Sequence, residues 1–547
     1  MNYFSAPGWC IAALAAAVML CGCAAGPDFK RPDAPSASSY VPQPIPSATA
    51  SSPVMAGQPQ HFDAKKDIPF DWWTLFQSPQ INALIERAFK ASPGIESAQA
   101  ALRQAQEYVT AQQGFFYPTV GASYSPSRNK LAGNMGGNSP GVQGDGTVIQ
   151  TYSNPAGPAP FNAPVYYNFH IAQLTVGYVP DVFGGNRRQV ESLQAQLNTQ
   201  RYQLEAAYIT LASNIVAAAL QEASLRAQIA AMEKIVSINQ EALAILQKQR
   251  QLGFVSTLDV AAQDAALAQA GQALIPLQKQ LEQTRDLIRA LAGNPPNEDV
   301  PETFELALLH LPEDLPLSLP SRLVEQRPDV RAAEEQLHAA SAQYGVAIAN
   351  RLPQFSITAA VGGMASTPDW MFRSGGGFFN LTGNIAQTIF DGGTLRAKSR
   401  AAQQALIQAG AQYRGTVITA LQNVADTLHA IQSDAEALKA AARTEQAMRL
   451  TRDLTRKQYE TGYVSYQTLL LAEQNHQQAV VTLVQAQTNR FGDTAALYQA
   501  LGGGWWNRPA AASKQTEGGA NAEVARIDGE KTPVAQQLGM ATGETAP

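Results

Sequence analysis

The stretch that decides the fold is KQRQLGFVS at residues 248–256, which returns as KQYETGYVS at residues 457–465. The two copies are 209 residues apart, since 457 − 248 = 209. Each copy ends a long helical pattern and starts a second one, and Ser256 and Asp259 have the spacing of a capping box. A segment repeated in this way predicts two helical hairpins, each turning at a Gly-aromatic-Val-Ser tip.

The duplication extends through most of the chain. Pro93 matches Pro328 at an offset of 235, since 328 − 93 = 235, and Ala290 matches Ala500 at an offset of 210, since 500 − 290 = 210. Each copy is predicted to run helix, two strands, two helices. The predicted boundaries are a signal peptide at 1–22, a lipidated tether at 23–60, a first repeat at 61–310, a second repeat at 311–506 and a disordered tail at 507–547.

Period-two alternation of apolar residues indicates the strands. Phe355, Ile357 and Val361 alternate with small or polar residues. Near residues 165–179 the apolar phase shifts after Ile171, which predicts either a bulge or an exit from a bilayer. The elements expected are strands at about 119–127, 165–179, 354–363 and 378–390, a helix at about 321–351, and helical hairpins at about 187–292 and 394–501.

The helical segments are unusually long. No proline or glycine occurs from Arg187 to Arg250, and a helix of that length would extend roughly 96 Å at ~1.5 Å per residue. In the second copy the apolar positions from Val417 to Leu438 step by alternating fours and threes. A sustained period of 3.5 residues predicts left-handed coiled coils.

The N-terminus has the pattern of a secretory signal that ends in a lipobox. The apolar run Ile11 to Leu20 leads into Cys21-Gly22-Cys23, so Cys23 is predicted to be the acylated N-terminus of the mature protein. The first nine residues carry no Lys or Arg, which leaves open whether Met1 is the true start. The alternative is an ordinary cleaved signal with an incidental cysteine.

Composition excludes several classes of protein. The chain has 547 residues, of which 45% are hydrophobic, and apart from the N-terminal run it has no candidate for a membrane-spanning helix. The formal charge of 39 − 44 = −5 gives no basis for binding nucleic acid. All three cysteines lie within the first 23 residues, and the six histidines lack metal-binding spacing. We therefore expect no metal, no cofactor and no enzymatic activity.

Strands of about ten residues, apolar on one face and polar on the other, are typical of a β-barrel in a membrane. Four strands cannot close a pore, because bacterial barrels begin at eight. The chain is therefore expected to oligomerise. The alternative is that the strands form a soluble β-layer and that the chain is a lipid-anchored periplasmic coiled-coil scaffold with no pore.

The sequence resembles the outer-membrane factor family of TolC-like channel-tunnels, in particular its NodT-type lipoprotein branch. The motifs that carry the resemblance are Cys23 to Pro32 (CAAGPDFKRP), Asp71-Trp72-Trp73, Arg327-Pro328-Asp329-Val330, Asp391-Gly392-Gly393 and Ala500 to Trp505 (ALGGGW).

The resemblance implies a mixed α and β membrane protein, a trimer whose twelve strands form an outer-membrane barrel and whose helices form a periplasmic tunnel. It also implies a passive exit duct for small molecules such as drugs, working with a periplasmic adaptor and an inner-membrane pump of the RND type. An outer channel for a type I secretion system or for an ABC- or MFS-type exporter is the alternative. The transported substrate is not readable from the sequence.

The family also implies roles for the hairpin tips and for residues beside them. Adaptor docking is expected at Gly253, Phe254, Val255 and Ser256 and at Gly462, Tyr463, Val464 and Ser465. Asp259 and Tyr459 match gate positions, whereas Thr468 and Leu471 stand where relatives often carry aspartates. The closed state is therefore expected to use either a ring of Asp259 carboxylates or a hydrophobic closure by Leu471. Helix capping is an equally good explanation of Asp259.

Overall fold

The structure is a computed structural model that describes residues 24–36, 39–131 and 165–508. The described residues fall into two compact units, one within Met1–Arg31, Ala105–Leu197 and Glu335–Ala411, the other within Pro32–Gln104, Asn198–Glu334 and Gln412–Pro547. Each unit takes residues from both repeats, so the compact units do not follow the repeat boundary predicted near residue 310. Cys23 and the tail from residue 509 lie outside the described residues.

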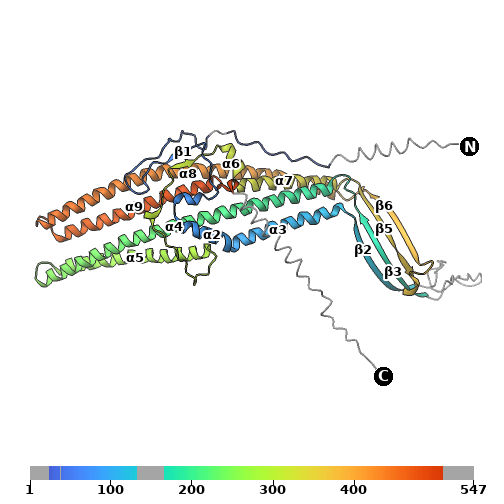
Figure 1. The fold of residues 1–547 in the computed structure, drawn as a ribbon, viewed down its shortest axis with the longest axis horizontal. Coiled ribbons are helices and arrows are strands. Elements are labelled where there is room, and N and C mark those ends of the chain that lie inside the picture. Colours follow the sequence, from blue (N-terminus) through green and yellow to red (C-terminus); the bar gives the residue numbers. More distant parts are fainter. Residues whose placement is uncertain (1–23, 37–38, 132–164, 509–547) are drawn as a thin grey trace, which may run out of the picture. The chain divides into compact units, whose positions relative to one another are not determined.

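Two helical hairpins occur in the chain (Figure 1). Helix α4 (Gly185–Gln251) turns into α5 (Thr257–Leu291), and α8 (Thr394–Glu460) turns into α9 (Tyr466–Ala500). Both long helices have 67 residues and both returning helices have 35. The two hairpins therefore match residue for residue along their length.

The 3.5-residue pattern accounts for the burial of these helices, because a heptad stripe faces the neighbouring helix. Buried members of the stripes include Leu204, Tyr208, Leu211, Ile215, Ala218, Leu225, Val417, Val424, Leu428, Ile431, Ala435 and Leu438. Among the described helices, α4 alone is long and apolar enough to cross a membrane. Its most apolar stretch is 61% buried, as in the core helix of a helical bundle.

Shorter helices precede each pair of strands. They are α2 (Pro79–Ala91) and α3 (Pro93–Gln113) in the first repeat and α6 (Pro320–Gln326) and α7 (Pro328–Ala349) in the second. The single helix predicted at 321–351 is therefore wrong. Pro328 disfavours helical backbone at Arg327, which has ψ 125°, so the helix ends there and a new one begins at the proline.

Four antiparallel strands form one sheet in the order β2-β3-β5-β6 (Figure 1). They are β2 (Thr119–Leu131), β3 (Val165–Tyr178), β5 (Gln354–Ala365) and β6 (Gly377–Ala386). Residue pairing runs without interruption along all three interfaces, so of the two explanations given for the phase shift in β3 the bulge is excluded. Strand β6 ends at Ala386 instead of residue 390, because its partner β5 begins at Gln354.

The two faces of the sheet differ in chemistry. Directly paired residues share a face, and the register assigns to one face Val120, Ala122, Tyr124, Leu174, Val176, Ile357, Ala359, Val361, Phe379, Leu381 and Ile385. The opposite face carries Thr119, Gly121, Ser123, Gln173, Thr175, Thr358, Gly362, Asn380, Thr382 and Asn384. Large side chains of the first set are exposed, for example Phe379 at 84% and Leu381 at 73%. We call the first set the apolar face and the second the polar face.

The segment predicted to be an extended tether that does not pack is in fact bound to the body. Val41, Ala56 and Gln60 are buried. The segment then enters strand β1 (His61–Asp63), which pairs in parallel with β4 (Asp314–Pro316) between the repeats. The Pro- and Ser-rich composition explains the lack of helix, but side chains of the body hold the backbone in place.

Candidate functional site

Both hairpin tips have the same backbone geometry. At the first, the amides of Gly253 and Phe254 donate to the carbonyl oxygens of Arg250 and Gln249 at 3.0 and 2.9 Å. Gly253 has φ +80°, and this pattern is a Schellman motif. A Cβ on Gly253 would meet nothing within 4 Å, so the backbone conformation and not the space requires glycine.

The second tip repeats this pattern. Gly462 also has φ +80°, and the amides of Gly462 and Tyr463 donate to the carbonyls of Tyr459 and Gln458 at 2.9 and 2.8 Å. The glycines predicted from the repeat therefore have one identical local function. They end the long helices and reverse the chain.

The serines of the tips begin the returning helices. Ser256 accepts from the amide of Asp259, and the Asp259 carboxylate accepts in turn from the amide and the hydroxyl of Ser256 at 2.9 and 2.7 Å. Ser465 caps α9 by accepting from the amide of Thr468. Hydrogen bonds from Ser256 lower the pKa of Asp259, so this carboxylate is ionised throughout the neutral range.

Large apolar side chains are exposed at both tips. Phe254 is 77% and Tyr463 is 85% exposed, and Leu252 and Leu258 beside the first tip are 65% and 77% exposed. Val255 and Ser465 line one cavity of about 160 Å³ with α4 residues such as Leu246. The two tips therefore lie close together within the second unit. Apolar groups gathered in this way favour a protein partner.

The remaining gate candidates lie just before and after the second tip. The rings of Tyr459 and Tyr466 are 5.1 Å apart, and the Tyr466 hydroxyl is 3.5 Å from a carboxylate oxygen of Glu241 on α4. Burial and the Glu241 charge raise the pKa of Tyr466. Of the four gate candidates, Asp259 and Thr468 take part in helix capping. Tyr459 and Leu471 instead have exposed side chains, at 40% and 57%.

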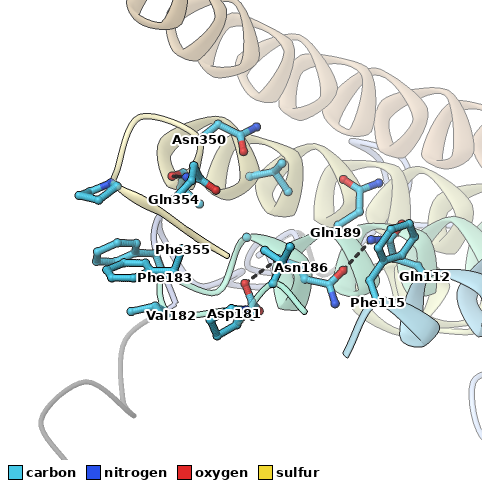
Figure 2. Close-up of a pocket in the computed structure, with 16 residues that line it drawn as sticks. Gln112, Phe115, Asp181, Val182, Phe183, Asn186, Gln189, Asn350, Gln354 and Phe355 are labelled. Atoms are coloured by element: carbon cyan, nitrogen blue, oxygen red, sulfur yellow. Dashed lines mark hydrogen bonds between the residues drawn. The ribbon is translucent and has the colours of Figure 1, made fainter. Parts of the chain in front are cut away.

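A cavity of about 300 Å³ lies in the first unit where helices and strands join (Figure 2). Gln112 donates to the Asn186 side-chain oxygen at 2.6 Å, and Asp181 accepts from the backbone amides of Asn186 and Arg187 at 2.8 Å each. Asp181 therefore caps α4, as Asp391 caps α8 by accepting from the Leu395 amide at 2.7 Å. The polar lining consists of amides and a carboxylate already engaged in capping, with no nucleophile beside a base.

Two arginines that sequence reasoning missed hold the N-terminal segment. In the first unit Arg188 forms an ion pair with Asp28 at 2.6 Å and donates to the Ala25 carbonyl at 3.2 Å. The Phe29 ring stacks on His338 with centroids 4.3 Å apart. Gly26 lies so close to helix α7 that a Cβ would come within 2.6 Å of the Cα of Gly345. Residues just after Cys23 are thus bound beside the strand-to-helix turn.

In the second unit Arg490 is fully buried and donates to the carbonyls of Ala56 and Gln58 at 2.6 and 2.8 Å, and to the Thr49 hydroxyl at 2.8 Å. Burial lowers the pKa of Arg490, an effect that Asp434 opposes. Asp434 on α8 lies beside Asp493 on α9, and burial together with that neighbour raises the pKa of Asp493. In the sequence, this cluster is marked only by single charged residues among the apolar positions of the heptad pattern.

No group of three or more His, Cys, Asp or Glu that could hold a metal ion occurs among the described residues. The features described so far are a two-faced sheet and two hairpin tips with exposed apolar side chains. A two-faced four-strand sheet joined to coiled-coil hairpins defines the class of outer-membrane channel-tunnels.

The chain belongs to the outer membrane efflux protein family, whose model matches residues 84–294 and 319–503, once in each repeat. It is 28% identical over 442 residues to the pyoverdine export outer membrane protein OpmQ of Pseudomonas aeruginosa, covering 79% of this chain and 87% of the relative. It is 26% identical over 500 residues to the toluene efflux pump outer membrane protein TtgC of Pseudomonas putida, covering 91% and 96%.

The fold matches that of the CmeC outer membrane channel of Campylobacter jejuni with a TM-score of 0.76, at 22% identity, covering 90% of this chain and 98% of that one. The protein is therefore an outer-membrane channel of an efflux system, as its resemblance to the channel-tunnels predicted. Its family consists of channel proteins, and its location is the outer membrane.

Proposed function

We propose that three copies of this chain assemble into a passive exit duct that docks, through its hairpin tips, onto the periplasmic adaptor of an RND-type pump. Trimer formation is supported by the strand order, in which β2 and β6 are the two edges of the sheet among the described residues. In lipid an open edge would leave unpaired amides, each costing several kcal/mol. Three four-strand sheets would pair edge to edge and close into a barrel of twelve strands.

The observation that carries the docking proposal is the exposed apolar surface on two adjacent tips. Phe254 and Tyr463 follow the Schellman glycines directly, so both side chains are fixed to a rigid turn. Burying two such rings in a partner supplies a few kcal/mol. The tips therefore form a compact hydrophobic contact, and the energy for transport comes from the pump.

The test is a double substitution, Phe254→Ser with Tyr463→Ser. We expect adaptor binding to weaken at least tenfold and export to fall, while the trimer and its conductance in planar bilayers persist. Leu308→Ser with Leu319→Ser is the matched control, because those leucines are 62% and 51% exposed in the second unit away from the tips. Equal binding by the double variant and the native protein would overturn the docking proposal. A monomer without conductance would overturn the channel assembly.

For the closed state we propose a hydrophobic constriction by Tyr459 and Leu471, with Asp259 serving as a helix cap. The carboxylate of Asp259 already accepts two hydrogen bonds from Ser256. Leu471→Ser should then raise conductance of the resting channel in planar bilayers. Asp259→Asn should leave it unchanged, and a larger increase from Asp259→Asn than from Leu471→Ser would favour a carboxylate ring.

We also propose that Cys23 is the acylated residue. The support is the binding of Ala25 to the strand-to-helix turn, where its amide donates to the Phe183 carbonyl at 2.8 Å. An acyl chain on Cys23 would then enter the bilayer next to the sheet. Labelling with radioactive palmitate should be lost in Cys23→Ser and kept in Cys21→Ser; the reverse result would move the lipobox.

A further inference from the structure

The end of the sheet farthest from the helices differs from the rest. Strand β5 pairs with β3 from His170 to Tyr178, whereas β2 and β3 pair on to Leu131 and Val165. Beyond His170, the apolar residues Phe169 and Tyr167 lie on the polar face. The phase shift in β3 thus marks the place where the two faces exchange their chemistry.

Two cations occupy the apolar face beyond that point. The register places Arg128 and Lys130 on the same face as Val120 and Tyr124. Both are exposed, and neither forms an ion pair with any described residue. The ammonium of Lys130 lies 5.4 Å from the centroid of the Tyr166 ring, its cross-strand partner, which is itself 59% exposed. The two side chains are one pleat apart, which is ~7 Å at ~3.4 Å per residue.

The neighbouring charges do not neutralise this surface. Within the described strands of the sheet and the β5–β6 connection, Asp369 is the sole acidic residue, and it lies 3.6 Å from Arg373. Arg373 lies 5.4 Å from the Trp370 ring centroid, so a second basic and aromatic pair is present on that connection. Among the described residues, this end of the sheet therefore carries a net positive charge, in a chain whose net charge is −5.

The height of the cations along the sheet matches the surface of a bilayer. Tyr117, 72% exposed at the helix end of β2, and Arg128 are eleven residues apart. At ~3.4 Å per residue and a tilt of about 40°, that distance spans roughly 28 Å along the membrane normal. The apolar band of outer-membrane barrels is about 25 Å tall and is bordered by aromatic residues. Arg128 and Lys130 thus lie just past the far edge of the band.

We propose that Arg128, Lys130 and Tyr166 form a binding site for the phosphate groups of a phosphorylated glycolipid in the outer leaflet. The helices are periplasmic, so this end of the sheet is the one at the outer surface. Arginine binds phosphate through two parallel N–H donors, and lysine adds a point charge. Tyr166 offers ring surface at the level where sugar headgroup meets acyl chain. The inference rests on the outer-membrane location and is independent of tip docking.

The test uses the full-length trimer in detergent, titrated with bisphosphorylated lipid A and followed by native mass spectrometry. Arg128→Gln with Lys130→Gln removes both charges and keeps side-chain length. At the strength usual for basic residues near an anionic surface, binding should weaken about thirtyfold. Lipid A without phosphates should bind the native trimer with the same low affinity.

Arg396→Gln with Lys398→Gln is the matched control, because it removes an exposed arginine and lysine, also two positions apart, beyond the opposite end of the sheet. It should bind lipid A like the native protein, and Arg128→Lys should retain most of the affinity. Equal affinity of the Gln pair and the native trimer would overturn the site. Phosphatidylglycerol binding as tightly as lipid A, with the same loss in the Gln pair, would overturn its assignment to the glycolipid.

Discussion

Replacing Asp493 by asparagine should make the protein more stable in alkali and leave it unchanged in acid. Burial and the neighbouring Asp434 raise the pKa of Asp493 to about 7. Asparagine keeps the shape and can donate a hydrogen bond to Asp434, as the protonated acid does. The substitution therefore removes one titration from the α8–α9 interface and little else.

The sign follows from proton binding. Because the pKa of Asp493 is higher in the folded chain than its ordinary value of 3.8, the folded state holds the proton more tightly than the unfolded state does. The stability contributed by this proton is complete below about pH 3.8 and is lost as the pH rises through about 7. Above that pH two carboxylates face each other across the hairpin.

The free-energy difference can be worked from the same values. The interval from 3.8 to about 7 corresponds to roughly 4 kcal/mol at ~1.36 kcal/mol per pH unit. Solvent reaches part of this site, so screening reduces the effect to about 2 kcal/mol. Asp493→Asn should therefore raise the melting temperature by a few degrees at pH 8.5, by roughly a third as much at pH 5, and by nothing measurable below the ordinary pKa of 3.8.

The assay is thermal unfolding of the detergent-solubilised trimer from pH 5 to 9, followed by circular dichroism. Asp434→Asn should act similarly, because either change leaves one carboxylate to balance Arg490. The double variant should lose stability at every pH, since Arg490 would then be buried without a counter-charge. Parallel pH curves for Asp493→Asn and the native protein would refute the reasoning.

Three further changes test other parts of the structure. Phe379→Asp places a charge on the apolar face and should block assembly in the outer membrane, whereas Asn380→Asp on the polar face should still yield heat-modifiable trimers on gels; equal assembly would refute the face assignment. Proline at position 462 cannot adopt φ +80° and has no N–H to donate to the Tyr459 carbonyl. Gly462→Pro should therefore abolish export, measured by drug susceptibility, while the trimer persists on gels. Arg490→Gln should expose the segment near Ala56 to limited proteolysis and lower the free energy of unfolding by about 3 kcal/mol; unchanged cleavage would show that Arg490 does not hold this segment.

The regular elements could be predicted from the sequence because each has a periodic pattern. The heptads gave the 67-residue helices to within two residues at either end, and the alternation located all four strands. Errors occurred where a contact outside the element decides the outcome. Strand β6 ends opposite the first residue of β5. The unbroken ladder of β3 excludes a bulge, which was one of the two explanations of its phase shift.

The candidate site divides in the same way. The tip glycines and serines were predictable, because a reversal between two helices demands φ > 0 and a cap at fixed positions. The binding of residues 24–60 to the body was not predictable. Arg188 and Arg490 donate to backbone carbonyls, and because every residue has one, no residue type indicates such a contact. Composition indicates only that such a segment forms no helix.

The repeats also show which dimensions of the molecule are constrained. Their offset is 354 − 119 = 235 at the first strand and 394 − 185 = 209 at the long helix, so the first strand hairpin is longer by 26 residues. Beyond that point the helices of the two repeats agree in length residue for residue. A partner that contacts both tips requires this equality, because one extra helical turn would displace one tip by ~5.4 Å from the other. No such demand acts on the length of the strand hairpins, and that is where the two copies differ in length.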